Sequence, residues 1–117
     1  MQNYKDLLVW QRAHKLVLLI YEVCSGFPRE EDYALVRQLK RAAYSIPVNI
    51  AEGSGRLSKK DFAHFLQIAL GSVHELEYLV LLAKDLSFLA KERFEILNQE
   101  INEIKAMLIV FIKKIRQ

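Results

Sequence analysis

The chain has 117 residues, of which 52% are hydrophobic and 26% are charged, with one cysteine, two prolines and four glycines. These values predict one globular domain over residues 1–117, and they exclude a disordered chain and a scaffold that needs disulfides or a metal to fold. The formal net charge of +3 is mild, so a basic surface is allowed but not required.

The single cysteine, Cys24, has no partner for an internal disulfide and has apolar neighbours, so we interpret it as a small core residue in a reducing compartment. A reactive thiol is the alternative. Lys5 and Asp6 lead directly into an amphipathic pattern rather than a secretory signal. The apolar runs 16–21 and 78–83 are too short to span a bilayer. We therefore expect a cytoplasmic protein with no membrane partner.

The first predicted helix covers residues 5–24. Its apolar residues alternate spacings of three and four, a heptad stripe that no strand produces: Trp10, Ala13, Val17, Ile20 and Cys24, followed by Phe27. We expect Gly26 to cap this helix, with Pro28 beyond it. The acidic residues 30–32 precede the second helix, where negative charge favours the positive end of a helix dipole.

The second predicted helix covers residues 33–52, with a core stripe of Leu39, Ala43, Ile46 and Ile50. Pro47 lies inside it and removes one backbone hydrogen bond, so a kink or a restarted helix is expected there. The run 53–55, Gly-Ser-Gly, is expected to end the helix. Within residues 33–56 the chain carries four basic residues against one acidic residue.

Two longer helices are predicted to follow, over residues 59–84 and 90–116. Ser58 precedes the third helix as an N-cap, with Asp61 three residues on in the position of a capping-box carboxylate. The heptad rule recurs in both stripes: Phe62, Leu66, Ala69, Val73, Leu76, Val80 and Ala83; then Phe94, Leu97, Ile101, Ile104, Leu108, Phe111 and Ile115. Short links between four such helices predict an all-α, antiparallel, up-down-up-down four-helix bundle.

The core stripes do not account for all the apolar residues of three of the helices. The additional ones are Leu8, Leu18 and Leu19; Ile68, Leu79, Leu81 and Leu82; and Ile96, Ile109, Val110 and Ile112. Helices that are apolar nearly all round must bury a second face. Lipid would require longer apolar runs, so we expect a homo-oligomer.

No enzyme active site is predicted, and neither a metal nor a cofactor is expected. A di-iron bundle needs Glu-x-x-His pairs in mid-helix, whereas this chain offers only Asp61 and His64 at a helix start and His74 beside a glutamate. Cys24 lies in a core stripe. The run 53–56 lacks the Lys-Ser or Lys-Thr and the preceding strand of a phosphate loop, so it is interpreted as a helix stop.

One face of the second predicted helix is polar, with spacings of three and four. Its members are Gln38, Arg41, Ser45, Asn49 and Glu52, and Gln67, Gly71 and Glu75 of the third helix are candidates to face it. Three of these residues are expected to form a buried or interfacial network, because arginine favours a bidentate carboxylate partner. In one interpretation this polar network fixes helix register or subunit packing.

In the other interpretation this region is a nucleic-acid surface whose basic side chains meet phosphates. The candidate residues are Arg37, Lys40, Arg41, Arg56, Lys59 and Lys60. Tyr33 and Tyr44 lie nearby and are candidates to stack on bases, although tyrosines on helices usually pack against neighbours.

A long motif in the middle of the chain resembles a known family. It consists of Gln38-x-x-Arg41-Ala42-x-x-Ser45-Ile46-Pro47-x-Asn49-Ile50-Ala51-Glu52-Gly53, then Arg56, then Phe62-x-x-Phe65-Leu66-x-x-Ala69-x-Gly71-Ser72-x-x-Glu75-Leu76. With these residues the chain is similar to the 23S ribosomal RNA intervening-sequence proteins. The resemblance implies a bacterial four-helix bundle that assembles as a homopentamer, and it supplies no catalytic residues.

Two functional hypotheses follow. The first is a homo-oligomer that binds RNA or DNA through weak basic patches repeated in each copy. The second is a scaffold or accessory subunit that binds a protein partner and has no intrinsic nucleic-acid role. An enzyme is the least favoured alternative, since no cluster of ionisable groups suggests a pocket.

Overall fold

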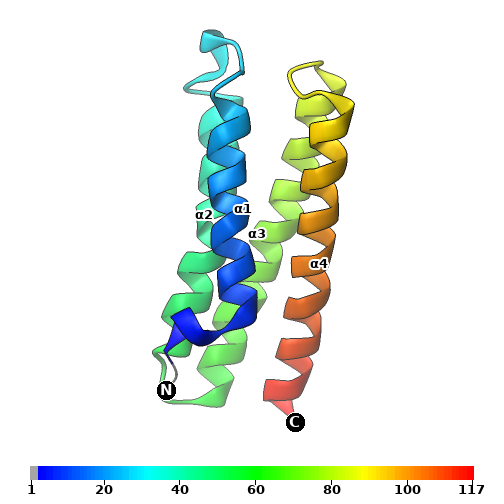
Figure 1. Cartoon of the computed structure of the whole chain (residues 1–117). Helices are drawn as coiled ribbons and strands as arrows, with labels where there is room; N and C mark the ends of the chain where they lie inside the picture. The colour runs from blue at the N-terminus through cyan, green and yellow to red at the C-terminus, as the bar shows by residue number, and fades with distance from the viewer. Residues whose placement is uncertain (1–2) are drawn as a thin grey trace.

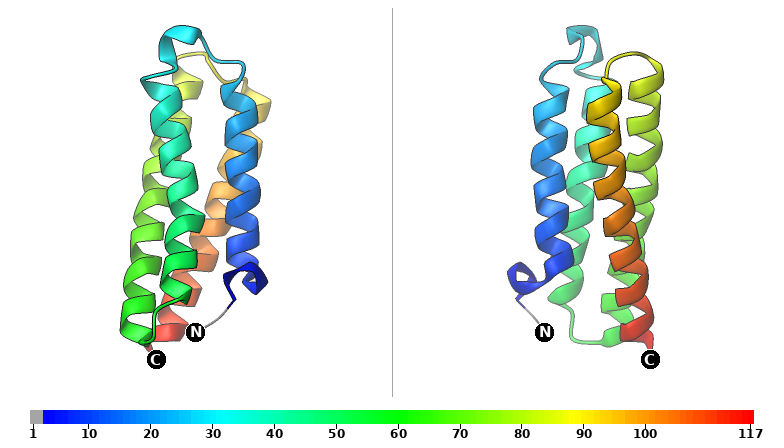
Figure 2. Two further views of the ribbon diagram at one scale, coloured as in Figure 1. Left: turned by 90° about the vertical axis from the view of Figure 1, so that its left-hand side faces the viewer. Right: turned by 45° about the vertical axis from the view of Figure 1, so that its right-hand side comes forward.

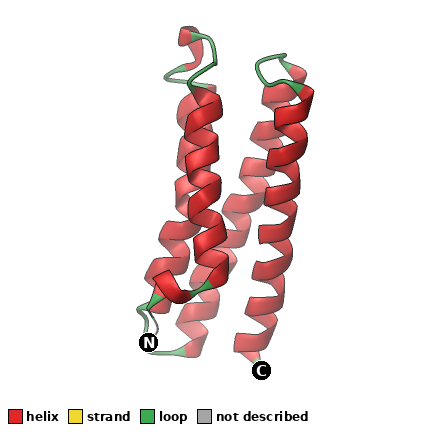
Figure 3. Ribbon diagram, viewed as in Figure 1, coloured by secondary structure: helices red, strands yellow, loops and turns green. Residues whose placement is uncertain are grey.

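A computed structural model describes residues 3–117, which contain helices and no strands (Figure 3). In chain order the elements are a 3-10 turn η1 (Tyr4–Asp6), α1 (Leu8–Cys24), a 3-10 turn η2 (Arg29–Glu31), α2 (Leu35–Ser54), α3 (Lys59–Asp85) and α4 (Lys91–Arg116). The all-α class and the four predicted helices are confirmed.

The four helices lie side by side in a bundle of 44 × 23 × 20 Å (Figures 1 and 2). Consecutive helices run in opposite directions along the long axis, which is compatible with the expected up-down-up-down order. Both ends of the described chain and the link between α2 and α3 lie at the same end of the bundle. We call this end the terminal end.

The core consists of one set of apolar side chains from all four helices, with spacings of three and four along each helix. The predicted stripes of α2 and α3 are buried, apart from Phe62, which is half-buried. The predicted α1 stripe is buried at Ala13, Ile20 and Cys24 but was wrong at two positions, where Val9 and Leu16 are buried and Trp10 and Val17 are half-buried. The residues on both sides of the seam are apolar, so the α1 sequence by itself does not determine which of them faces inward.

The end of α4 differs from the prediction in the same way. Ile112 is buried in the core although it was assigned to the second apolar face, and Phe111 and Ile115 are half-buried. Of the other additional apolar residues, Leu19, Leu79 and Leu82 are half-buried and the rest are exposed: Leu8, Leu18, Ile68, Leu81, Ile96, Ile109 and Val110.

α2 continues through Pro47, so a restart there was wrong, and it ends at Ser54 with Gly55 as its C-cap, inside the run 53–55 that was predicted to end it. Ile46 and Ile50, one turn apart on either side of Pro47, are fully buried, and this packing offsets the missing backbone hydrogen bond. Gly53 lies against α3, where a Cβ would be 2.7 Å from Cβ of Phe65. Its role is close helix approach rather than termination.

Helix caps follow the sequence in part. Ser58 Oγ accepts a hydrogen bond of 3.1 Å from the backbone N–H of Asp61, as predicted. Glu31 Oε1 accepts a hydrogen bond of 3.4 Å from the N–H of Leu35, the first residue of α2. The cap of α1 is Ser25 instead of Gly26, which does not adopt a positive φ.

α3 has 27 residues and a mean hydropathy of 1.3 in its most apolar window, so by length and composition it is able to cross a membrane. A core helix in a bundle passes the same test. The buried residues of α3 recur every three or four positions from Ala63 to Ala83 and pack in the common core. The lack of a membrane partner stays a prediction.

Candidate nucleic-acid interface

The structure separates the predicted basic residues into two groups toward opposite ends of α2. The first group, Arg37, Lys40 and Arg41, lies in the first half of this 20-residue helix, and the second begins just beyond its last residue. A helix of this length extends over about 30 Å. One phosphate contact cannot join the two groups, so each must be considered as a surface of its own.

The first group lines a hollow of about 590 Å³ on the outer side of α1 and α2. Tyr33 and Tyr44 line it too, as expected for candidates that stack on bases, and so do Tyr21 and Asp32. The Nζ atom of Lys40 lies 4.6 Å from the centre of the Tyr21 ring. This group therefore combines three cations with a carboxylate and several aromatic rings.

The second group, Arg56, Lys59 and Lys60, lies at the terminal end. There the last turn of α4 adds basic side chains that the sequence analysis did not assign to a site. Together they form what we call the basic end, which consists of Arg56, Lys59, Lys60, Lys113, Lys114 and Arg116. All six side chains are exposed.

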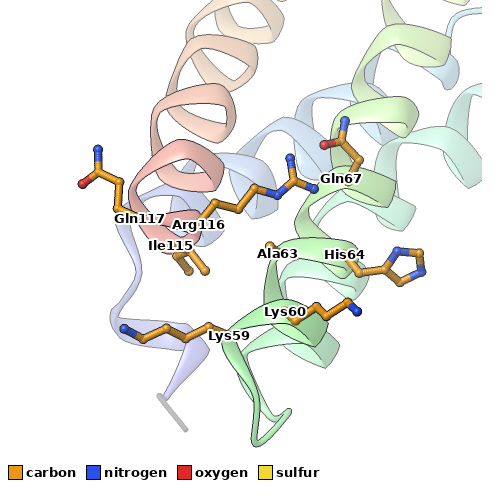
Figure 4. Close-up of a pocket in the computed structure, with 8 residues that line it drawn as sticks. All are labelled: Lys59, Lys60, Ala63, His64, Gln67, Ile115, Arg116 and Gln117. Atoms are coloured by element: carbon orange, nitrogen blue, oxygen red, sulfur yellow. The ribbon is translucent and has the colours of Figure 1, made fainter.

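Figure 4 shows part of this arrangement. Lys59 and Lys60 extend in different directions from the first turn of α3, and the guanidinium of Arg116 extends from α4 toward Gln67 on α3. These residues, with His64, line a hollow of about 550 Å³ between the two helices. The hollow is open, its lining is more apolar than polar, and its ionisable side chains are basic.

The basic end carries most of the excess charge of the protein. Glu52 and Asp61 are the carboxylates nearest in sequence to Arg56, Lys59 and Lys60, and Glu103 is the nearest to the three basic residues of α4. In the rest of the chain acidic residues slightly outnumber basic ones. None of the ion pairs formed within residues 3–117 involves these six side chains. Arg56 has an aromatic neighbour instead, with Cζ 4.6 Å from the centre of the Phe65 ring. The end is thus a concentrated positive patch, in which Asp61 is the one acidic side chain in the first turn of α3.

The helix dipoles act differently on the two sides of this patch. The basic residues of α4 lie in its last turn, where cations are favourable. Lys59 and Lys60 occupy the first turn of α3, where the dipole and the free N–H groups favour an anion. Two lysines there cost about 0.3–1 kcal/mol each, and Asp61 in the same turn offsets part of this cost. An anion bound between the lysines and the helix start would remove this penalty.

The predicted polar network is formed only around Ser45. Its hydroxyl is 2.8 Å from the hydroxyl of Ser72 on α3, and Asn49 Nδ2 donates hydrogen bonds to the carbonyl and hydroxyl oxygens of Ser45 at 2.8 and 3.1 Å. Gln38, Arg41, Glu52, Gln67 and Glu75 are exposed. Within residues 3–117 their side chains make no hydrogen bond or ion pair with another protein group.

Gly71 lies on the exposed face of α3 beside this stripe, and a Cβ there would have no atom within 4 Å. Ser72 was missed as a network member in the sequence analysis, although it is part of the family-like motif. The signal available was its small polar side chain, placed one residue after Gly71 and on the side of α3 that faces α2.

The residues considered for catalysis or metal binding are Cys24 and the three histidines. Cys24 is 4% exposed, and burial raises the pKa of its thiol from 9.0 to about 11, an effect that the charge of Lys40 partly opposes. The predicted core role of Cys24 is therefore confirmed. His14, His64 and His74 are exposed. Residues 3–117 contain no group of three or more histidine, cysteine, aspartate or glutamate residues arranged to hold a metal ion.

Fold and surface together define an all-α bundle protein whose most distinctive chemistry is a basic patch at one end. The family model of the 23S rRNA-intervening sequence proteins matches residues 5–110, and the chain belongs to that family. The resemblance noted from the sequence is thereby confirmed.

A solved structure supports this assignment. The chain is similar to a crystal structure at 1.70 Å resolution of a protein of unknown function from the S23 ribosomal protein family of Bacteroides thetaiotaomicron VPI-5482. The two are 27% identical, the TM-score is 0.85, and the match covers 91% of this chain and 99% of the other. No curated protein matches the chain.

Proposed function

We propose that this protein is a non-enzymatic, homo-oligomeric nucleic-acid-binding protein that contacts phosphates through the basic end. The observation that carries this proposal is the group of six exposed basic side chains without an ion-pair partner among residues 3–117. Such a patch binds phosphate backbones electrostatically and with little sequence preference. Because the family description refers to 23S rRNA, RNA is the first ligand to test.

The basic end is a better phosphate surface than the first half of α2. Around Arg37, Lys40 and Arg41 the hollow contains the carboxylate of Asp32, which weakens the local positive potential. This hollow also shares Tyr44 with an apolar groove on α1 and α2 that a second copy of the chain would cover. Arg37, Lys40 and Arg41 remain candidates for a secondary contact.

Self-association is supported by an apolar face on α1 and α2. Tyr44 and Val48 of α2 line a groove together with Trp10, His14 and Val17 of α1. Tyr44 is 46% and Val48 51% exposed. An exposed face of this kind marks an interaction site more often than free surface. Association through it would combine several basic ends in one particle, a pentamer if the family resemblance extends to assembly, and binding would gain by avidity.

The proposal is tested by fluorescence anisotropy with a structured RNA and a matched duplex DNA over a salt series. The test variant is K59Q/K60Q/K114Q at the basic end. The control is K91Q/K84Q/R93Q at the opposite end of the bundle, where Lys91 begins α4 as Lys59 begins α3. A third variant, R37Q/K40Q/R41Q, tests the first half of α2.

For the wild type, we expect the logarithm of the association constant to fall linearly with the logarithm of salt concentration. The slope should decrease in magnitude by about one for each lysine removed at the basic end. The control should keep the wild-type slope. Equal losses in the test and control variants would place the contact elsewhere, and absence of binding at physiological salt by assembled protein would exclude the proposal.

A protein-interaction scaffold is the second candidate, and the exposed apolar side chains outside the α1–α2 face favour it. Tyr78 on α3 and Ile96 and Val110 on α4 are each more than half exposed. If the assembled wild-type protein binds no nucleic acid and these side chains remain exposed in the oligomer, a protein partner becomes the better account of the surface.

A further inference from the structure

The terminal end contains a second pocket, of about 410 Å³, which is lined by two aromatic rings and three cationic side chains. Phe62 of α3 and Phe111 of α4 meet there edge to face, with ring centres 5.5 Å apart and planes at 84°. Arg56, Lys59 and Lys114 line the same pocket. Its volume is within the usual range for small-molecule sites.

α1 does not extend as far as α4 at this end of the bundle (Figure 2). α1 begins at Leu8, and Figure 2 shows α4 extending past the start of α1 at the terminal end. Phe62 and Phe111 are half-buried although they continue the heptad stripes of α3 and α4. The rings of Phe62 and Phe111 are therefore partly accessible, and three cations line the same pocket.

The α2–α3 link adds an apolar side chain to the pocket. Leu57 lines it and is 89% exposed. An apolar group beside two phenyl rings suits a flat, uncharged ring system, and the cations suit a negative group attached to it. An unpaired nucleotide has both parts: every base has a π-face for stacking, and the phosphate carries the charge.

From this arrangement we infer that the pocket binds an unpaired nucleotide of a single-stranded nucleic acid, with the base against Phe62 and Phe111 and its phosphate at Arg56, Lys59 and Lys114. The inference rests on the proposed function and deepens it. Duplex nucleic acid presents only phosphates to the basic end, because its bases are stacked and paired. Single strands should therefore bind more tightly than duplexes of the same length.

The test compares a short single-stranded oligouridine with an RNA duplex of the same length, by anisotropy at one salt concentration. Wild-type protein should favour the single strand. F111L keeps an apolar side chain of similar size and removes the ring, and it should weaken single-strand binding about tenfold while leaving duplex binding unchanged. Circular dichroism melting would show whether F111L is folded under assay conditions.

A second variant avoids any question of folding. L57S changes a side chain that is 89% exposed, and L86S changes one that is 48% exposed in the link at the opposite end. Single-strand affinity should fall in L57S and stay unchanged in L86S. In addition, oligonucleotides carrying 5-iodouracil should photocrosslink to peptides that contain residues 54–62 or 111–115.

The possible results separate this inference from the proposed function. If wild-type protein binds neither the single-stranded oligouridine nor the RNA duplex, both the proposed function and the inference about the pocket are wrong. If single strand and duplex bind equally, and F111L and L57S change neither, the basic end binds phosphates but the pocket takes no base. Selective loss of single-strand binding in F111L and L57S supports the inference.

Discussion

Gly53 on α2 and Phe65 on α3 are so close that a Cβ on Gly53 would lie 2.7 Å from the Cβ of Phe65. Phe62 is nearly as close, since its Cδ1 atom would be 3.0 Å from the same position. The Cβ atom of Phe65 is fixed to the backbone of α3, so it cannot move away unless the helix moves. Gly53 thus sets the distance between α2 and α3 beside the basic end.

We predict that Gly53→Ala destabilises the protein by about 1–3 kcal/mol, because the added methyl group forces two packed helices apart. Urea denaturation followed by circular dichroism measures the change. The control is Gly71→Ala, where a Cβ meets no atom within 4 Å and the free energy of unfolding should rise by about 0.5–1 kcal/mol. A stabilised Gly53→Ala protein would contradict the close packing described here.

The hydrogen bond between Ser45 and Ser72 gives a second prediction. Ser72→Ala removes the contact between α2 and α3 but leaves Ser45 bonded to Asn49, so the loss should be modest, about 0.5–1.5 kcal/mol. Ser45→Ala removes the Oγ contacts to both Ser72 and Asn49, leaves the bond from Asn49 Nδ2 to the Ser45 carbonyl, and should cost somewhat more. Equal effects of the two single variants would mean that the bond from Asn49 Nδ2 to Ser45 Oγ contributes no more than the bond from Ser72 Oγ to the Ile68 carbonyl, which Ser72→Ala also removes.

The buried thiol of Cys24 predicts a pH dependence on the alkaline side. The pKa of Cys24 is raised from 9.0 to about 11 in the folded state, so the folded protein retains a proton that the unfolded chain loses. Stability from this group is complete below pH 9 and decreases as the pH rises to 11. Cys24→Ala lacks this component, so the wild type should lose about 2 kcal/mol relative to it over that interval.

A thiol reagent provides an independent measurement of the same property. At pH 8 the native protein should react far more slowly than the urea-unfolded chain, because the thiol is buried and protonated. Rapid modification of the folded protein would contradict the burial of Cys24. It would also restore the reactive-thiol alternative.

The α1–α2 face predicts which substitution dissociates an oligomer. Val48 is 51% exposed beside Tyr44 and Trp10, and Val110 is 66% exposed on α4, away from that face. Val48→Lys should shift the protein toward monomer in sedimentation velocity, because it places a charge in an apolar contact. Val110→Lys should leave the sedimentation coefficient unchanged. If only Val110→Lys dissociates the oligomer, the interface lies on α4 instead.

The heptad pattern was enough to predict the helices because burial along a helix repeats every three or four residues. It failed where two adjacent residues are both apolar, as at Val9 and Trp10, since only packing against the other helices decides which faces inward. The packing role of Gly53 was missed for a related reason. Its requirement is a close approach between helices, which no local pattern records.

The candidate site was predictable only in part. The sequence identified Arg56, Lys59 and Lys60, which are near one another in the chain, but it joined them to Arg37 and its neighbours at the other end of α2. Lys114 was missed because more than fifty residues separate it from Lys60. Only the packing of α4 against α3 brings the two close enough to line neighbouring hollows.

An elongated protomer with its positive charge at one end has a polarity, and a closed assembly must preserve it. Cyclic symmetry with the axis along the bundle places every basic end on one rim, so that the ring has one charged and one nearly neutral side. Dihedral symmetry divides the basic ends between two opposite rims. The first arrangement offers a single strand one continuous track, whereas the second would hold two strands apart.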